Sequence, residues 1–171
     1  SDKLPIVEKL LDVCDTLIIG GGMAYTFQKA MGNTIGTSLL DESKIEDCKR
    51  VLKLAEEKGI NLLLPIDYVT SLDIKDTTNV KLTKDANIEE GYMGVDIGKK
   101  SIKLFVKAIK KAKTVIWNGP LGAFEIDKFS NVSGKKNIGG LIGYINNNVS
   151  IQNLTSKAIV TGNNYVGGIA G

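Results

Sequence analysis

Three consecutive glycines, Gly20, Gly21 and Gly22, follow an apolar run and precede residues with helical spacing. Glycine permits backbone angles at a tight turn that other residues avoid. It also lets a flat ligand lie against bare backbone, next to the amide groups of a helix start that bind anions. The segment matches neither the Gly-x-Gly-x-x-Gly fingerprint nor a P-loop. On these residues alone, a simple turn and a nucleotide-binding turn are equally good interpretations.

Four other positions carry polar or permissive groups suited to a nucleotide. Asn118, in Trp-Asn-Gly-Pro, places an amide at a strand end, where it approaches a ligand or caps its own turn. Glu125 is suited to hydrogen bonds from a ribose, although such a glutamate is more often solvated. Lys3 supplies a point charge for phosphate, with a solvated terminal lysine as the alternative. Gly94 lies in a turn-dense segment, 91–98, whose glycines admit a planar group.

Composition excludes several other kinds of site. The 171-residue chain has no histidine, so His-based triads and His metal sites are excluded. Cys14 and Cys48 lack metal-type spacing, and Cys48 falls on the apolar face of an expected helix, which predicts a buried, reduced thiol. A net charge of +3 gives no reason to expect nucleic acid as a partner. We expect no membrane span, no signal peptide and no metal site, and the missing initial Met suggests a cut chain.

Apolar spacing predicts the elements that must position these residues. Alternating strands and helices indicate an α/β fold with a parallel, Rossmann-like sheet and flanking helices. Ligands of such sheets lie beyond the carboxyl ends of the strands. Three strands here end in distinctive turns, which are the triple glycine, Pro65-Ile66-Asp67 and Asn118-Gly119-Pro120, so we predict a binding cleft at that edge. Helices are expected at about 5–11, 23–31, 45–55 and 102–112, strands at 16–19, 61–64 and 114–117, and loops with short strands at 71–90.

The amino-acid composition of the chain changes at about Phe129. Residues 130–171 contain no acidic residue and are rich in Gly and Asn. Within them, Ile-Gly-Gly-Leu-Ile-Gly at 138–143 recurs as Val-Gly-Gly-Ile-Ala-Gly at 166–171, a spacing of 28 residues. A fixed period of this size is typical of repeat architectures. We therefore predict two parts, residues 1–129 and residues 130–171, with unrelated architectures.

Taken in order, the motifs of the first part resemble phosphoglycerate kinase. No single motif is as specific as their succession, which covers about residues 1–129 and much of the C-terminal, nucleotide-binding domain of that family. The resemblance implies a glycolytic phosphotransferase of the cytoplasm that uses MgADP and MgATP as substrates, the metal being carried by the nucleotide. The matching segments are Ser1-Asp2-Lys3 and residues 18–27, 35–39, 64–67, 92–98 and 115–125.

The resemblance also implies roles for individual residues. The adenine slot would be lined by Gly21, Gly22, Leu39, Gly94 and Val95. Glu125 would hold the ribose hydroxyls, and Asn118 and Lys3 would approach the phosphates. The implied reaction is reversible phosphoryl transfer from 1,3-bisphosphoglycerate to MgADP, which gives 3-phosphoglycerate and MgATP. Such catalysis consists mainly of positioning and charge neutralisation, so the absence of a histidine base is no objection.

The sequence also departs from the family. It lacks the N-terminal domain that binds phosphoglycerate and supplies a catalytic arginine, the Gly-Ala-Lys element, and the later Gly-Gly-Gly-Asp-Ser/Thr and Ser-Thr-Gly-Gly-Gly segments. We therefore expect an adenosine site with a weakened phosphate grip, no catalytic residue within this chain, and no turnover by the chain alone. Phosphoglycerate is expected as a partner only if the missing domain is supplied. Losing hydrogen bonds of roughly 1.5–3 kcal/mol each would move a micromolar site to millimolar or beyond.

Residues 130–171 resemble the GLUG repeat of bacterial surface and adhesin-like proteins. This resemblance implies short strands stacked in a β-solenoid-like tail and, for the tail alone, a place at the cell surface. The alternative is a disordered Gly/Asn-rich tail. Because about three repeats are usually needed for a common core, we expect loose folding, with the tail patching an open sheet edge that would otherwise invite aggregation. The alternative functions are a surface repeat protein with a vestigial α/β part, or a chimeric gene fragment.

Overall fold

The computed structural model describes residues 3–76, 78–117 and 119–123, together with short strands between 132 and 167. The chain divides into two compact units, Ser1–Ala108 and Ile109–Gly171, and each is described by itself. The boundary expected at Phe129 lies outside the described residues and stays a prediction. Among the described residues, no helix combines the length and the apolar character that a bilayer crossing requires.

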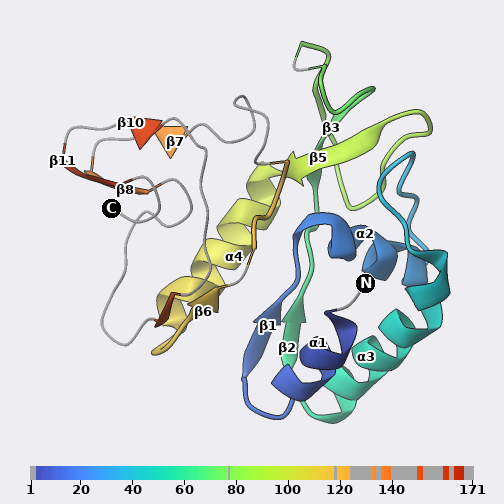
Figure 1. Ribbon diagram of the computed structural model, residues 1–171, viewed down its shortest axis with the longest axis vertical. Coiled ribbons are helices and arrows are strands. Elements are labelled where there is room, and N and C mark those ends of the chain that lie inside the picture. Colours follow the sequence, from blue (N-terminus) through green and yellow to red (C-terminus); the bar gives the residue numbers. More distant parts are fainter. Residues whose placement is uncertain are drawn as a thin grey trace. The chain divides into compact units, whose positions relative to one another are not determined.

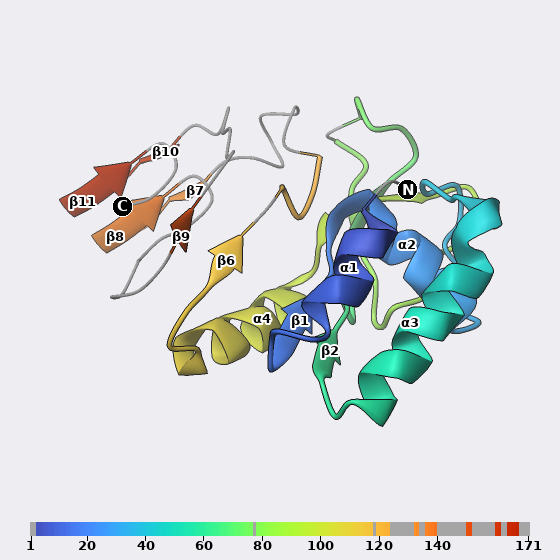
Figure 2. The ribbon, with the colours of Figure 1, turned by 60° about the horizontal axis from the view of Figure 1, so that its bottom comes forward.

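The first unit begins with helices around a pair of parallel strands, as predicted from the alternating pattern. Figures 1 and 2 show α1 and α3 beside the two strands, β1 and β2. The strands pair in parallel with Thr16 opposite Asn61 and Ile18 opposite Leu63. The elements are α1 (Leu4–Leu10), β1 (Thr16–Ile18), α2 (Gly21–Ala30), the 3₁₀ turn η1 (Glu42–Lys44), α3 (Ile45–Glu57) and β2 (Asn61–Leu63).

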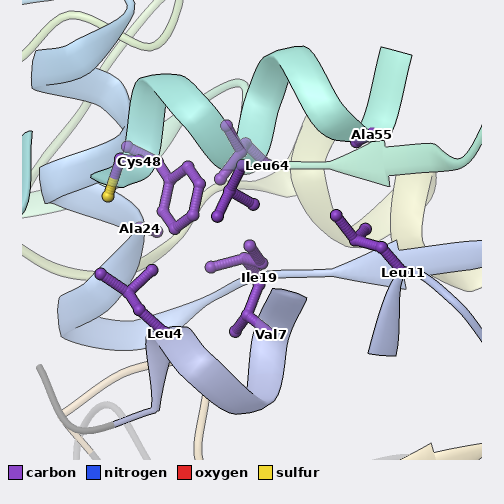
Figure 3. Close-up of a cluster of buried hydrophobic side chains, with 10 residues drawn as sticks. Leu4, Val7, Leu11, Ile19, Ala24, Cys48, Ala55 and Leu64 are labelled. Atoms are coloured by element: carbon purple, nitrogen blue, oxygen red, sulfur yellow. The ribbon is translucent and has the colours of Figure 1, made fainter. Parts of the chain in front are cut away.

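A hydrophobic core between these elements packs α1, α2 and α3 against the strands. On α3, the buried side chains Cys48, Val51 and Ala55 recur at steps of three and four, the period of one helix face. They meet Phe27 of α2, which is fully buried, so helix positions follow directly from apolar spacing. Figure 3 shows this cluster, which consists of Leu4, Val7, Leu11, Ile19, Ala24, Phe27, Cys48, Val51, Ala55 and Leu64.

The same unit contains a second, antiparallel sheet that the sequence pattern did not predict. Its strands are β3 (Tyr68–Ser71), β4 (Lys81–Leu82) and β5 (Met93–Ile97), in the order β4-β3-β5. The expectation that 91–98 is mainly turn is therefore wrong. Val95 and Ile97 are buried and alternate along β5, which is what a half-buried strand requires. Gly91 and Gly98 lie outside the two ends of this strand, and Gly94 lies within it, against the ring of Tyr25. After β5 the chain continues directly into α4 (Lys99–Lys111).

The second unit consists of short strands in parallel pairs. β6 (Ile116–Trp117) pairs with β9 (Ser150–Ile151), so the expectation that it joins the sheet of the first two strands is wrong. A two-residue strand makes few ladder hydrogen bonds, so it can pair with any strand edge that is available. Here its partner is a strand of the tail. The other pairs are β7 (Val132–Ser133) with β10 (Val160–Thr161) and β8 (Lys136–Gly139) with β11 (Asn164–Gly167).

Candidate functional site

The glycine turn leads directly into α2. Gly20 is extended at φ −132° and ψ −169°, and Gly21 then takes φ +62°, a left-handed angle that favours glycine. No side chain caps the helix start. The amide groups of the first turn of a helix have no intrahelical partner, and they carry its positive dipole end. The turn therefore presents bare backbone, against which a flat ring can lie, and partial positive charge, which favours an anion.

Leu39 lies against Gly22, the last glycine of this turn. A Cβ atom added to Gly22 would lie 3.2 Å from Leu39 Cδ1, so a larger residue there would displace this methyl group by a few tenths of an ångström. Leu39 is 74% exposed. Gly22 and Leu39 together form a small apolar surface open to solvent.

An open pocket of about 290 Å³ adjoins this surface. Its polar groups are Thr26, Asp41 and Lys44, of which Thr26 Oγ1 accepts a hydrogen bond from the amide of Asp41 at 3.3 Å. Lys44 Nζ is paired with Asp47 Oδ2 at 3.3 Å. No sequence motif marks these three residues, so they were not predicted as site residues. The full lining is Leu4, Gly22, Met23, Thr26, Leu39, Leu40, Asp41, Lys44 and Cys48.

Cys48 lines this pocket as a buried, unpaired thiol, as predicted. Burial raises its pKa to about 11, and the carboxylates of Asp47 and Asp41 add to the shift. The thiolate is the reactive form of cysteine. Cys48 is therefore an apolar wall of the pocket rather than a nucleophile.

Gly94 and Val95 belong to β5, next to α2. The amide of Gly94 donates a 2.8 Å hydrogen bond to Ser38 Oγ, the residue before Leu39. A Cβ atom on Gly94 would overlap the ring of Tyr25, which comes from α2. Val95 is only 2% exposed, so its side chain packs inside the unit. The structure therefore joins Gly94 to the segment that carries Leu39.

Of the three residues predicted to contact ribose and phosphate, only Lys3 is among the described residues. Lys3 is exposed and directly precedes α1, where its carbonyl oxygen accepts hydrogen bonds from the amides of Ile6 and Val7 at 3.0 and 2.9 Å. Its neighbour Leu4 lines the pocket. Asn118 and Glu125 lie outside the described residues, so their roles stay predictions. Among the described residues, no group of three His, Cys, Asp or Glu side chains is arranged to hold a metal ion.

Asp67, at the second of the three strand ends, caps a helix rather than facing a cleft. Its carboxylate accepts hydrogen bonds from Ser101 Oγ at 2.6 Å and from the amides of Ser101 and Lys100 at 2.7 and 2.9 Å, at the start of α4. Burial alone would raise the pKa of Asp67, but these hydrogen bonds outweigh it and leave the pKa below its usual range. A Cβ on Gly98 would overlap this carboxylate, so glycine is required there. The expectation that this strand end faces a ligand is wrong for Asp67.

Known proteins resemble most of this chain. The family model described as phosphoglycerate kinase matches residues 1–148, which extends past the boundary expected at Phe129. The phosphoglycerate kinase of Clostridium tetani is 53% identical over 130 residues, which cover 76% of this chain and 32% of that protein. That of Clostridium botulinum (strain Hall) is 55% identical over 131 residues, or 77% of this chain and 33% of that protein. The chain thus spans about a third of the length of these curated relatives.

Two solved structures share its fold. The phosphoglycerate kinase of Coxiella burnetii superposes with a TM-score of 0.72 at 33% identity, covering 75% of this chain and 33% of that one. The phosphoglycerate kinase of Pyrococcus horikoshii superposes with a TM-score of 0.58 at 22% identity over the same shares, which shows a common fold. The α/β architecture derived from the sequence is therefore confirmed.

Proposed function

The chain belongs to the phosphoglycerate kinase family, and on that premise we propose that residues 1–129 are the adenine-nucleotide-binding part of a glycolytic kinase. The observation that carries the proposal is the apolar surface formed by Gly22 and the exposed Leu39, at the uncapped start of α2. A flat base fits against a residue without a side chain. Phosphates fit near unpaired helix amides. Gly21, Gly94 and Val95 complete the proposed adenine slot.

The proposed reaction is phosphoryl transfer between 1,3-bisphosphoglycerate and MgADP, which yields 3-phosphoglycerate and MgATP. This chain would contribute binding and orientation, because Lys3 and Asn118 approach the phosphates and Glu125 holds the ribose. The magnesium ion enters as part of the nucleotide substrate. Catalysis of this kind depends on positioning and on neutralising charge, not on a covalent protein intermediate.

We further propose that turnover requires a phosphoglycerate-binding part that the present sequence does not contain. The chain as given would bind nucleotide weakly, in the millimolar range, and would not form ATP by itself. A cytoplasmic location follows for the kinase-like part from the proposed glycolytic role. Robust ATP formation from 1,3-bisphosphoglycerate by the pure chain would overturn this proposal.

Calorimetric titration of the purified chain with MgADP tests the nucleotide site. We expect saturable binding that Glu125→Ala and Lys3→Ala each weaken by about tenfold, because each removes a charge-assisted contact worth roughly 1.5 kcal/mol. Glu56→Ala and Lys53→Ala change the same charges on exposed positions of α3 and should leave the affinity unchanged. Absence of binding at MgADP concentrations well above the millimolar range would mean that the kinase relationship describes ancestry rather than present activity.

A second function is favoured by the register of the tail strands. Val132 lies opposite Val160 and Ile138 opposite Val166, and both parallel pairs are offset by the 28 residues that separate the sequence repeats. Period and register coincide when each repeat forms one rung of a solenoid. We propose that residues 130–171 form two such rungs, as in GLUG-type repeats, and that a role at the cell surface follows for the tail.

Cysteine cross-linking tests the rung register. In a Cys14→Ser background, Val132→Cys with Val160→Cys should form an intramolecular disulfide under mild oxidation, because directly paired strands bring Cα atoms within disulfide range. Val132→Cys with Asn164→Cys is the control, shifted by four residues. Equal cross-linking of both pairs, or of neither, would favour the disordered tail instead. Sequencing gene and transcript across residues 125–135 tests the remaining alternative, a chimeric gene fragment.

A further inference from the structure

The segment before Leu39 is fastened to the chain around β5. Ile35 forms a parallel bridge with Ile88, and the amide of Thr37 donates a 2.8 Å hydrogen bond to the carbonyl oxygen of Tyr92. Ser38 completes the series by accepting the amide of Gly94 at 2.8 Å. We call residues 35–38 the clasp. It links two chain segments that lie more than fifty residues apart in the sequence.

The clasp has strict steric requirements. Gly36 has φ +53°, and a Cβ there would lie 2.6 Å from the carbonyl oxygen of Glu89 and 3.1 Å from Ile88 Cγ2. Only glycine therefore permits this approach. Ser38 is 8% exposed, and its own amide donates to the carbonyl oxygen of Ile35 at 3.0 Å. The Ser38 hydroxyl is therefore largely shielded from solvent.

The amide of Gly94, which donates to Ser38, lies at an irregularity in the antiparallel sheet. Val69 pairs with Asp96 but Thr70 pairs with Gly94, so the register shifts at this point and Val95 is the extra residue of β5. Such bulges redirect backbone groups out of the ladder. The Gly94 amide is thereby available to the hydroxyl of Ser38.

Contacts on the other side prevent β5 from approaching α2 any more closely. Gly94 lies directly against the ring of Tyr25, and Tyr25 in turn packs on Tyr68 with ring centroids 5.3 Å apart. The rings set a minimum separation between β5 and α2. The Ser38 hydrogen bond sets a maximum separation between β5 and the segment that carries Leu39.

From this geometry we propose that Ser38 is a positioning residue for the adenine slot. It does not touch the nucleotide; its bond to Gly94 fixes the spacing between one proposed wall, Gly22 with Leu39, and the other, the backbone at Gly94 and Val95, whose side chain packs inside the unit. The inference rests on the proposed nucleotide site. It adds that the clasp, rather than the glycines alone, determines how well a planar base fits.

The first test is made on the ligand-free full chain by NMR. Ser38→Ala should accelerate exchange of the Gly94 amide by about tenfold and weaken the nuclear Overhauser contact between the Leu39 methyl groups and the Gly22 α-protons. Ser71→Ala is the matched control, because Ser71 is fully buried in the same sheet and donates a 2.6 Å bond to the carbonyl of Asp76. Unchanged Gly94 exchange, or an unchanged Leu39–Gly22 contact, in Ser38→Ala would overturn the inference whether or not nucleotide binds.

The second test separates positioning from stability. At a temperature where all variants are folded, Ser38→Ala should raise the Kd for adenosine and for MgADP by the same factor, about tenfold, since the slot contacts only the part that the two ligands share. Ser71→Ala should lower the melting temperature and leave both Kd values unchanged. If wild type binds and Ser38→Ala retains full affinity, Ser38 is only structural. If wild type binds neither ligand, the proposed function fails, and the NMR result alone decides the clasp.

Discussion

Asp96 is a half-buried carboxylate on β5. Burial raises its pKa to about 6, and the 2.7 Å hydrogen bond from the amide of Ile97 offsets only part of that shift. Its polar neighbour is the phenol of Tyr25, whose own pKa is raised by burial and then by Tyr68 and Asp96. Asp96 therefore favours its protonated form in the folded chain more than in the unfolded chain.

Replacement of Asp96 should change how stability depends on pH. An acid whose pKa rises on folding binds its proton more tightly in the native state, so stability is greatest below the unfolded pKa of 3.8 and falls as pH rises to about 6. Asp96→Asn should remove this fall and raise the free energy of unfolding at pH 7 by about 3 kcal/mol, the equivalent of a pKa shift from 3.8 to about 6. Chemical denaturation at pH 4 and pH 7 measures it. Asp73→Asn, at an exposed turn, is the control. A gain at pH 4 as large as that at pH 7 would exclude this explanation.

Asp67 is expected to be among the most costly carboxylates to remove. Asp67→Ala leaves the amides of Lys100 and Ser101 without their acceptor at the start of α4, and the site is 4% exposed. We expect a loss of about 2–3 kcal/mol in the free energy of unfolding, the sum of a lost cap and of buried donors left unpaired. Urea denaturation would show it. Asp73→Ala also removes an acceptor of one backbone amide, Lys75, but on the exposed surface, and should cost far less.

Residue roles were predictable from sequence only where a backbone requirement or a family motif marked them. Gly21 and Gly22 stood out because they belong to a run of three glycines, and Gly21 does adopt a left-handed angle. Ser38 and Lys44 did not, because their roles depend on chain segments that meet only after folding. Asp67 was placed correctly at a strand end but given the wrong partner, since nothing in the local sequence shows that α4 begins beside it.

At the scale of elements, helices were predictable and the antiparallel sheet was not. Buried positions on α3 recur at helical steps, so spacing alone locates the helix. β5 was missed because glycines surround it, and because its partner β3 is recognised only by long-range pairing. β6 was found as a strand but assigned to the wrong partner, since two residues carry no register information.

α2 connects the core to the glycine turn, so its packing can be tested separately from the turn. Phe27→Ala removes a fully buried ring from the hydrophobic cluster and should cost about 3–5 kcal/mol, a lost transfer energy plus a cavity. Met31→Ala, at the 56% exposed end of the same helix, is the control and should cost little. Thermal and urea unfolding followed by circular dichroism would measure both. Equal costs for the two variants would mean that α2 is not held by this core.

At the scale of the whole molecule, the main core belongs to one unit only. Its ten buried residues run from Leu4 to Leu64, within Ser1–Ala108. The rung pairs of the tail connect residues 132–139 with residues 160–167, within Ile109–Gly171. Each unit therefore has stabilising contacts of its own, and we expect the two units to unfold in separate steps.

This separation predicts that damage to the core leaves the tail register intact. In the Cys14→Ser, Val132→Cys, Val160→Cys chain, adding Phe27→Ala should lower the denaturation midpoint of the first unit without changing the rate of disulfide formation in the tail. Adding Met31→Ala should change neither quantity. Cross-linking followed through a urea titration gives both values from one sample. If the disulfide disappears at the urea concentration that unfolds the first unit, and Phe27→Ala shifts both transitions together, the tail depends on the kinase-like unit. Its rungs would then be an addition to that unit rather than an independent solenoid.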